Sequence, residues 1–403
     1  MVHLSFRVLL VLTPAFDPNA GGVQMSTYKM ARCFSAQGHS VSIFSFSNSE
    51  QKSLEGCNVL QVDDESGPRS EVNLIAFESY VRKFAPDIVI NQMPYEHEIG
   101  EVLRHGKNYL LLGCLRNTLF SVIGDLDGYI DRIFPSAVAR LLKNPLGRAA
   151  IRMSHRKRHS KDLRRILDTY DHFVMFGPPN LEELRYFVPD FHHERVRLVP
   201  NSIPTVVDSV PSKENRILWL GRVENAQKRA DLIPAVWRSV SERLPDWHLD
   251  VVGDGADIEA LKAAASEMKL PRIHFHGRQV PDGFYRDASI FFMTSAFEGF
   301  PNTLVEAQSY AAVPVVFDSY PVASWIVDAG ESGELIRPFD TSSMAACIVE
   351  LATDLDRRHT MAKNALESAR RFRIENVGAI WQALFEAEVP KHIYSESRFS
   401  AES

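Results

Sequence analysis

The 403-residue sequence has few cysteines and no long apolar run. Its four cysteines, Cys33, Cys57, Cys114 and Cys347, lie far apart without CxxC spacing, so neither a disulfide framework nor a zinc site is expected. No stretch of 18 apolar residues predicts a membrane-spanning helix. The apolar run at residues 8–12 is short, is followed by no small-residue cleavage site, and is typical of a buried strand. We therefore expect a cytoplasmic protein.

A dinucleotide-binding fingerprint is also missing. The glycine pair after the first predicted strand stands in "NAGGVQ", which is not GxGxxG, and the second predicted strand ends in "FSFSNS", without an acid to hold a ribose. These two absences disfavour an NAD-dependent oxidoreductase. The formal net charge of −6 gives no overall attraction to nucleic acid.

The sequence does contain an alternating strand and helix pattern that starts twice. With 45% hydrophobic and 24% charged residues, the composition is that of a soluble globular protein, and the length suggests two domains. Strand-like runs alternate with helix-like runs from "FRVLLVL" onward, and the pattern restarts at "RILWLG". This predicts an α/β fold of two Rossmann-like domains, 1–203 and 204–377, and a helix over 378–395.

Two cations follow the first strand of the second predicted domain. Arg222 comes directly after "LWLG", and Lys228 stands six residues later, at the start of a predicted helix over 229–243. Cations at the carboxyl end of a strand suit a diphosphate, although an ordinary pair of surface charges is the better explanation for them in isolation. In "VVGDGADIEAL", Asp257 is predicted to cap a helix over 257–269.

The segment "FEGFPNTLVEAQ" places Glu298 and Glu306 on either side of a turn. A helix beginning at Asn302 would aim the free amides from Thr303 to Val305 at the turn, a suitable place for phosphate oxygens. A carboxylate before the turn could accept hydrogen bonds from sugar hydroxyls. For each glutamate alone a structural role is favoured, with Glu298 as a loop charge and Glu306 as a first-turn acid.

Taken together, these motifs resemble the retaining glycosyltransferases of family four, of the bacterial surface-polysaccharide type. The similarity rests on the order of the Gly-Gly loop, "GRVENAQKRAD", "VVGDGADIEAL", "IHFHG", "EGFPNTLVEA" and "VPVV", and it covers residues 198–340 and, more weakly, 5–46. Members share the GT-B fold, in which two Rossmann-like domains face a central cleft and a C-terminal helix crosses back to the N-terminal domain. They also share a Glu-x7-Glu motif.

The resemblance implies a role for each matching residue. Arg222 and Lys228 would hold the donor diphosphate, Glu298 would lie at the donor sugar as a catalytic residue, and Glu306 would bind the ribose. The other implied donor contacts are Gly22, Arg278, Phe300, Pro301, Asn302, Thr303 and Leu304. No metal or other cofactor is expected, because protein cations would stabilise the leaving diphosphate.

The sequence departs from the family pattern at two places. Many members have a sugar-contacting histidine after the strand "YLLLGCL", where this chain has Arg116 and Asn117, and His97 is a candidate substitute. These three residues are therefore the candidate sugar or acceptor contacts of the N-terminal domain. The second departure is Ala311, which stands where glycine is usual and would be strained if its φ were positive.

Residues 140–165 are strongly basic. A helix beginning at Pro145 would place Leu146, Ala149, Ala150 and Met153 on one face. Such a helix could bind the anionic inner face of a membrane, and a solvated helix packed on its apolar stripe is an equal alternative. Nucleic acid is not expected, since no aromatic residues interleave the charges. The segment has one acid, Asp162, and ten cations: Arg140, Lys143, Arg148, Arg152, Arg156, Lys157, Arg158, Lys161, Arg164 and Arg165.

We expect a transferase that moves a hexose or N-acetylhexosamine from a UDP-sugar to a lipid-linked or growing surface glycan, as in lipopolysaccharide or capsule synthesis. Glu298→Ala and Lys228→Ala are expected to fold normally and lose transfer. Two alternatives remain open. A GT-B sugar-nucleotide epimerase or hydrolase would consume its substrate without an acceptor, and a non-catalytic subunit would bind the nucleotide sugar without turnover.

Overall fold

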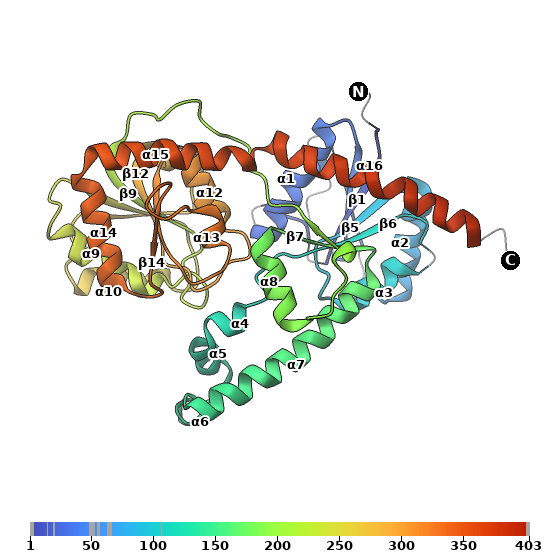
Figure 1. Ribbon diagram of the computed structural model, residues 1–403, viewed down its shortest axis with the longest axis horizontal. Helices are drawn as coiled ribbons and strands as arrows, with labels where there is room; N and C mark the ends of the chain where they lie inside the picture. The colour runs from blue at the N-terminus through green and yellow to red at the C-terminus, as the bar shows by residue number, and fades with distance from the viewer. Residues whose placement is uncertain are drawn as a thin grey trace.

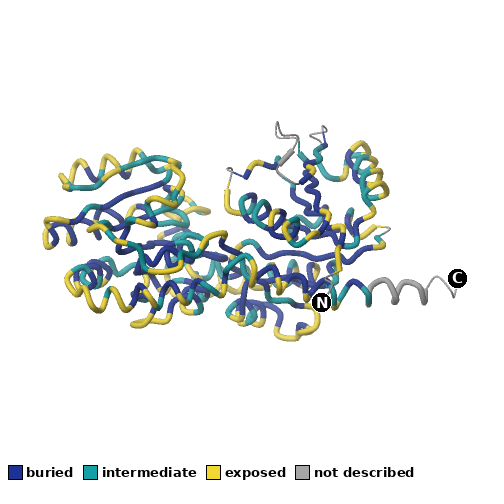
Figure 2. The backbone as a smooth tube through the Cα atoms, turned by 90° about the horizontal axis from the view of Figure 1, so that it is seen from above, coloured by how far each residue is buried: buried dark blue, intermediate teal, exposed yellow. Residues whose placement is uncertain are grey.

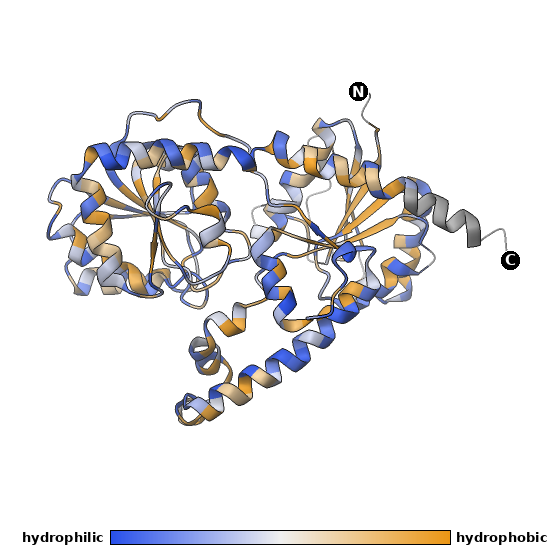
Figure 3. Ribbon diagram, viewed as in Figure 1, coloured by the Kyte–Doolittle hydropathy of each residue, from blue (hydrophilic) through white to orange (hydrophobic). Residues whose placement is uncertain are grey.

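The computed structural model describes residues 4–13, 15–18, 21–47, 53–54, 57–62, 67–105 and 107–399. Within these ranges the chain forms two α/β units that lie side by side, and an arm of helices extends from the first unit (Figure 1). Buried strands run through the middle of each unit and more exposed helices cover them (Figure 2). The strands are also the most hydrophobic elements (Figure 3). The predicted α/β class is confirmed.

The first sheet has eight strands among the described residues, in the order β3-β4-β2-β1-β5-β6-β7-β8. Every neighbouring pair is parallel except β3 with β4. Leu9 of β1 lies opposite Val89 of β5, and both are fully buried, as expected for a parallel sheet covered on both faces. The strands are β1 (Arg7–Leu12), β2 (Ser40–Ser45), β3 (Ser53–Leu54), β4 (Cys57–Gln61), β5 (Ile88–Asn91), β6 (Leu110–Cys114), β7 (His172–Met175) and β8 (Val196–Leu198).

The second sheet is entirely parallel, in the order β11-β10-β9-β12-β13-β14. Its central strand β9 therefore lies between β10 and β12, which come later in the sequence. The strands are β9 (Glu214–Leu220), β10 (His248–Val252), β11 (Ile273–Gly277), β12 (Ala288–Met293), β13 (Val313–Phe317) and β14 (Glu334–Ile336). The helices of this unit are α9 (Ile233–Ser241), α10 (Ile258–Glu267), α11 (Asp282–Asp287), α12 (Asn302–Ser309), α13 (Ala323–Ile326), α14 (Thr341–Thr353) and α15 (Leu355–Ala369).

The helix predicted over 229–243 is shorter in the structure. Arg229 has a left-handed φ of 49°, a 3₁₀ turn follows at Ala230–Leu232, and α9 begins only at Ile233. A right-handed helix cannot pass through a left-handed residue, and Pro234 is tolerated in the first turn of α9. Ala311, just after α12, has a φ of 59°, so the strain that its position suggested is present.

Two chain segments connect the units, and they are hydrogen-bonded to each other. The Ile203 N–H donates to the carbonyl of Phe372 at 2.9 Å, and the Ile374 N–H donates to the carbonyl of Ile203 at 3.2 Å. Helix α16 (Ile374–Phe399) then runs back across the first unit, and it is longer than the predicted 378–395.

Helix α16 is held by aromatic contacts with α1 (Gly22–Ala36). The rings of Trp381 and Phe385 lie 5.6 and 5.3 Å from that of Phe34, in edge-to-face geometry. The predicted return of the C-terminal helix to the N-terminal domain is therefore confirmed. The other helices that cover the first sheet are α2 (Glu71–Phe84), α3 (His97–Arg104) and α8 (Pro178–Phe187).

The arm is built from α4 (Ser121–Gly124), α5 (Leu126–Ile133), α6 (Ser136–Leu142) and α7 (Pro145–Thr169). Helix α7 begins at Pro145 as predicted, and the Asn144 side chain accepts a hydrogen bond from the Gly147 N–H at 2.9 Å. Leu146 and Met153 are 84% and 71% exposed, so the predicted apolar stripe is not packed against the protein. Among the described residues, no helix is long and apolar enough to cross a membrane.

Candidate functional site

A cleft of about 960 Å³ lies between the two units, at the carboxyl ends of strands from both sheets. Open α/β sheets bind their ligands at these ends. The sequence-predicted residues that line the cleft are Gly22, Arg116, Asn117, Arg222, Lys228, Arg278, Glu298, Phe300, Asn302 and Thr303. The remaining four predicted residues, His97, Pro301, Leu304 and Glu306, are not part of its lining.

Glu298 and Lys228 form an ion pair in the cleft wall. The Lys228 Nζ donates to Glu298 Oε1 at 2.6 Å, and the Gln227 Nε2 donates to Glu298 Oε2 at 3.0 Å. The side chains of Glu298 and Lys228 are only 6% and 15% exposed. Because both side chains are so little exposed to solvent, the two charges interact more strongly than a surface pair. Gln227 was not among the predicted site residues, and only its position next to Lys228 in the sequence could have indicated it.

Gly299 allows the two units to approach closely beside this ion pair. A Cβ atom added to Gly299 would lie 2.6 Å from Asn117 Cα and 3.1 Å from the carbonyl oxygen of Arg116. Any other residue would force the backbones of the two units apart. The turn that carries Glu298 is therefore in direct contact with the segment that follows β6.

Helix α12 begins at Asn302 as predicted, but fewer of its amides are free than expected. The N–H groups of Leu304 and Val305 both bond to the carbonyl of Pro301, at 3.0 and 3.3 Å. Pro301 is the N-cap, whose carbonyl accepts the first helical bonds. Within the described residues, the Thr303 N–H has no backbone partner and the Thr303 Oγ1 is buried without a hydrogen bond. Thr303 thus offers two unused polar groups to the cleft.

Glu306 is occupied by protein partners. Lys29 of α1 donates to its Oε1 at 2.8 Å and the Tyr285 hydroxyl donates to its Oε2 at 2.9 Å. Burial and the Glu306 charge hold the pKa of Tyr285 well above its ordinary value, so the hydroxyl keeps its proton. The Lys29–Glu306 pair joins the two units beside the cleft. A ribose contact for Glu306 therefore stays a prediction, and the ribose would have to share this carboxylate with Lys29.

The loops after β9 and β10 support one another through close backbone contact. Gly253, with a φ of 136°, leaves no room for a Cβ, which would lie 1.8 Å from the Gly221 carbonyl oxygen. Asp257 occupies the N-cap position of α10 as predicted, but its carboxylate makes no capping bond and instead accepts from the Asn225 N–H at 2.7 Å. This bond fixes the loop between Arg222 and Lys228. The Arg222 side chain itself is 65% exposed and available to a ligand.

The N-terminal unit contributes α1 and the segment after β5. Helix α1 starts at Gly22 without a side-chain cap, while Asn19 and Ala20 of the glycine loop lie outside the described residues. His97 is turned away from the cleft, with its Nε2 3.4 Å from Asp162 of α7. Its neighbours Tyr95 and Glu96 line the cleft instead. Asn117 is exposed there, as a sugar or acceptor contact would be.

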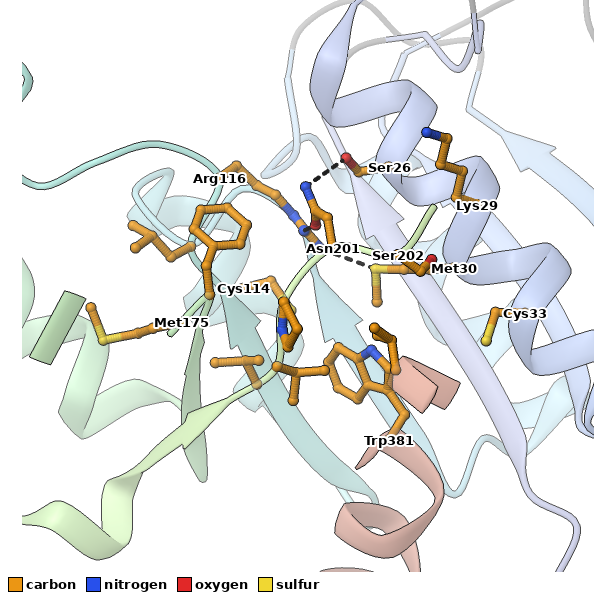
Figure 4. Close-up of a pocket in the computed structure, with 16 residues that line it drawn as sticks. Ser26, Lys29, Met30, Cys33, Cys114, Arg116, Met175, Asn201, Ser202 and Trp381 are labelled. Atoms are coloured by element: carbon orange, nitrogen blue, oxygen red, sulfur yellow. Dashed lines mark hydrogen bonds between the residues drawn. The ribbon is translucent and has the colours of Figure 1, made fainter. Parts of the chain in front are cut away.

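Arg116 lines both the cleft and a small adjoining cavity of about 20 Å³ (Figure 4). Burial lowers the pKa of Arg116, but a guanidinium stays charged at any physiological pH. Among the described residues, no group of three or more His, Cys, Asp or Glu side chains is arranged to hold a metal ion.

Part of the second unit matches a known protein family, and several known proteins are similar in sequence to part of the chain. Residues 214–354 match the family model "Glycosyl transferases group 1". Lipopolysaccharide 1,6-galactosyltransferase of Salmonella typhimurium is 33% identical over 149 residues, 34% of this chain and 40% of the relative. Amylovoran biosynthesis glycosyltransferase AmsD of Erwinia amylovora is 31% identical over 139 residues, 32% of this chain and 35% of the relative. The matches thus span two-fifths or less of these relatives.

The fold of the whole chain is also known. A variant of S. aureus TarM, in complex with fondaparinux, alpha-GlcNAc-glycerol and UDP, superposes with a TM-score of 0.72 at 13% identity, covering 94% of this chain and 99% of that chain. The segment 214–354 contains Arg222, Lys228, Glu298 and Glu306. Through this segment the chain is similar to the glycosyl transferases group 1, and as a whole it has the GT-B fold.

Proposed function

We propose that this chain is a retaining glycosyltransferase that moves a hexose or N-acetylhexosamine from a UDP-sugar to a lipid-linked or growing surface glycan. The observation that carries the proposal is the convergence of Glu298, Lys228, Arg222 and the start of α12 on one interdomain cleft. Relatives named for lipopolysaccharide and amylovoran synthesis support the acceptor class, and the UDP in the TarM complex supports the donor.

The site residues can divide the reaction between them. Arg222, Lys228 and Thr303 would bind the diphosphate, and Glu298 would accept hydrogen bonds from the sugar and stabilise positive charge on it. The bond between the anomeric carbon and the diphosphate oxygen breaks, with its electron pair going to the diphosphate. The acceptor hydroxyl bonds to the same face of that carbon, and its proton passes to the released diphosphate. Retention follows from attack on the same face.

Protein cations would supply the positive charge that other transferases take from a metal. We therefore expect transfer to persist in excess EDTA, because Arg222 and Lys228 neutralise the leaving group. A transfer rate that vanishes with EDTA and returns with Mg²⁺ or Mn²⁺ would contradict this assignment.

The donor is tested by thermal shift with UDP-, GDP- and ADP-sugars, because a ligand that binds the folded state raises the melting temperature. A UDP-sugar should stabilise the protein most, and a clear preference for GDP-mannose would refute the donor assignment. The stabilising sugar, radiolabelled, should then be transferred to lipid-linked glycans. Consumption at the same rate without any acceptor would identify a hydrolase or epimerase instead.

The tip of the arm would bring the enzyme to its acceptor at the inner face of a membrane. Leu141, Leu146 and Met153 are each more than 70% exposed there. Four of the ten cations in 140–165 pair with acids of other elements, in the pairs Lys143–Asp131, Arg148–Asp127, Arg164–Asp190 and Arg165–Glu101. The other six include Arg140 and Arg152, which flank the apolar tip and suit anionic headgroups.

Vesicle sedimentation tests this part of the proposal. Wild-type protein should bind vesicles that contain phosphatidylglycerol and not vesicles of phosphatidylcholine alone. Leu146→Ser should weaken that binding, whereas Leu355→Ser, at a side chain 65% exposed on α15, is the matched control and should not. Equal binding by both variants would refute a role for the arm tip.

A further inference from the structure

Arg116 is a partly buried cation without an acidic partner among the described residues. Its Nη1 donates to Asn201 Oδ1 at 3.3 Å, its Nη2 lies 3.0 Å from Met30 Sδ, and its Nε is buried with no hydrogen-bond partner. Within the described part of the chain, no carboxylate lies within 4.0 Å of the guanidinium. A charge removed from water without a counterion is costly, so this position suggests a site that an anion completes.

The hydrogen bonds of Asn201 connect this guanidinium to two helices, and Figure 4 shows Asn201 between Arg116 and Ser26 of α1. The Asn201 Nδ2 lies 3.3 Å from Ser26 Oγ, in the second turn of α1, and 3.2 Å from Asn302 Oδ1, the first residue of α12. Both helices begin at the cleft, and neither has a side-chain cap. The positive ends of two helices, one from each unit, thus converge near the guanidinium of Arg116.

The cations of the cleft lie on both of its walls. Arg222 and Lys228 belong to the second unit, together with the unused hydroxyl of Thr303. Arg116 and the start of α1 belong to the first. A ligand with two linked phosphate groups could therefore meet positive charge from each unit.

We propose that Arg116 is a third cation of the diphosphate site, supplied by the N-terminal domain, and that the donor diphosphate is held between the two domains. This inference rests on the proposed function and assigns Arg116 to the diphosphate rather than to the sugar or acceptor. Arg222 and Lys228 bind the diphosphate from the side of α12, and Arg116 binds it from the side of α1. When the sugar leaves, the charge gained by the diphosphate oxygen is stabilised from both walls.

Calorimetric titration with UDP and with uridine, which has no phosphate, tests the proposal. Arg116→Gln should weaken UDP binding by about tenfold to a hundredfold, the value of a charge-assisted hydrogen bond, and leave uridine binding unchanged. Arg116→Lys should recover part of the loss. A Gln variant that binds UDP as the wild type does, or that loses UDP and uridine equally, would overturn the proposal.

A second variant covers the case in which Arg116→Gln fails to fold. Asn201→Asp keeps the arginine and gives it a carboxylate partner inside the protein. That carboxylate should compete with the ligand and weaken UDP binding without affecting uridine, and unchanged UDP affinity would contradict the inference. If wild-type protein bound no UDP at all, the proposed function itself would fail. If the wild type and the variants bound UDP equally, only the role of Arg116 would fail.

Discussion

Substitutions that break the Lys228–Glu298 ion pair are expected to have different effects on the stability of the protein and on its transfer activity. Lys228→Met removes the ammonium group and leaves the carboxylate of Glu298, 5% exposed, with the side chain of Gln227 as a hydrogen-bond donor. Removing one member of a buried pair costs about 3 kcal/mol, because the other charge stays buried without compensation. Glu298→Gln should cost a similar amount, since Lys228 then loses its counterion. The double substitution leaves no buried charge. We therefore expect its loss of unfolding free energy to be smaller than the sum of the two single losses by about 2 kcal/mol.

Urea denaturation of the four proteins measures this coupling, and transfer from a UDP-sugar measures the chemistry. All three variants should lose transfer, while the double variant should regain stability. The structure thereby changes the simpler expectation that single substitutions at these positions fold normally. If the losses of the two single variants add up to the loss of the double variant within about 0.5 kcal/mol, the ion-pair reasoning is refuted. Transfer at the wild-type rate by Lys228→Met would refute its place in the site.

Three further perturbations follow from local geometry. Gly299→Ala should abolish transfer because its Cβ would collide with the Asn117 backbone, whereas Gly283→Ala, with open space at its Cβ, should remain active in the same assay. Burial lowers the pKa of His159 to about 4, so its unfolded state binds more protons between pH 4 and 6.5. His159 should therefore contribute about 2 kcal/mol to the stability lost from pH 7 to 5, and His159→Phe should remove that contribution in urea titrations. Ala85→Gly should raise stability by about 1 kcal/mol, because Ala85 ends α2 with a left-handed φ of 48°; an unchanged melting temperature would contradict this.

Local patterns in the sequence predicted most elements of the fold. The start of α12 at Asn302 and of α7 at Pro145 follow from turn and capping chemistry that involves only neighbouring residues. The left-handed Arg229, by contrast, shortened a predicted helix, and no feature of the surrounding sequence required that conformation.

The contacts within the site depend on the order of the strands and could not be read from the sequence. Lys228 reaches Glu298 because β9 lies next to β12, although 70 residues separate the two side chains. Lys29 meets Glu306 across 277 residues because the two units face each other. His97 does not line the cleft, where its neighbours Tyr95 and Glu96 lie instead. Tyr95 and Glu96 precede α3, whereas His97 is the first residue of that helix and contacts Asp162 of α7.

Titration of UDP into the wild-type protein and into Lys228→Met tests the central claim most directly, because it requires neither the sugar nor the acceptor to be known. The interdomain cleft should bind UDP, and the loss of the Lys228 ammonium should weaken that binding by at least about tenfold while uridine binding stays the same. A wild-type protein that does not bind UDP, or a Lys228→Met variant that binds it equally well, would contradict the assignment of the cleft as a sugar-nucleotide site.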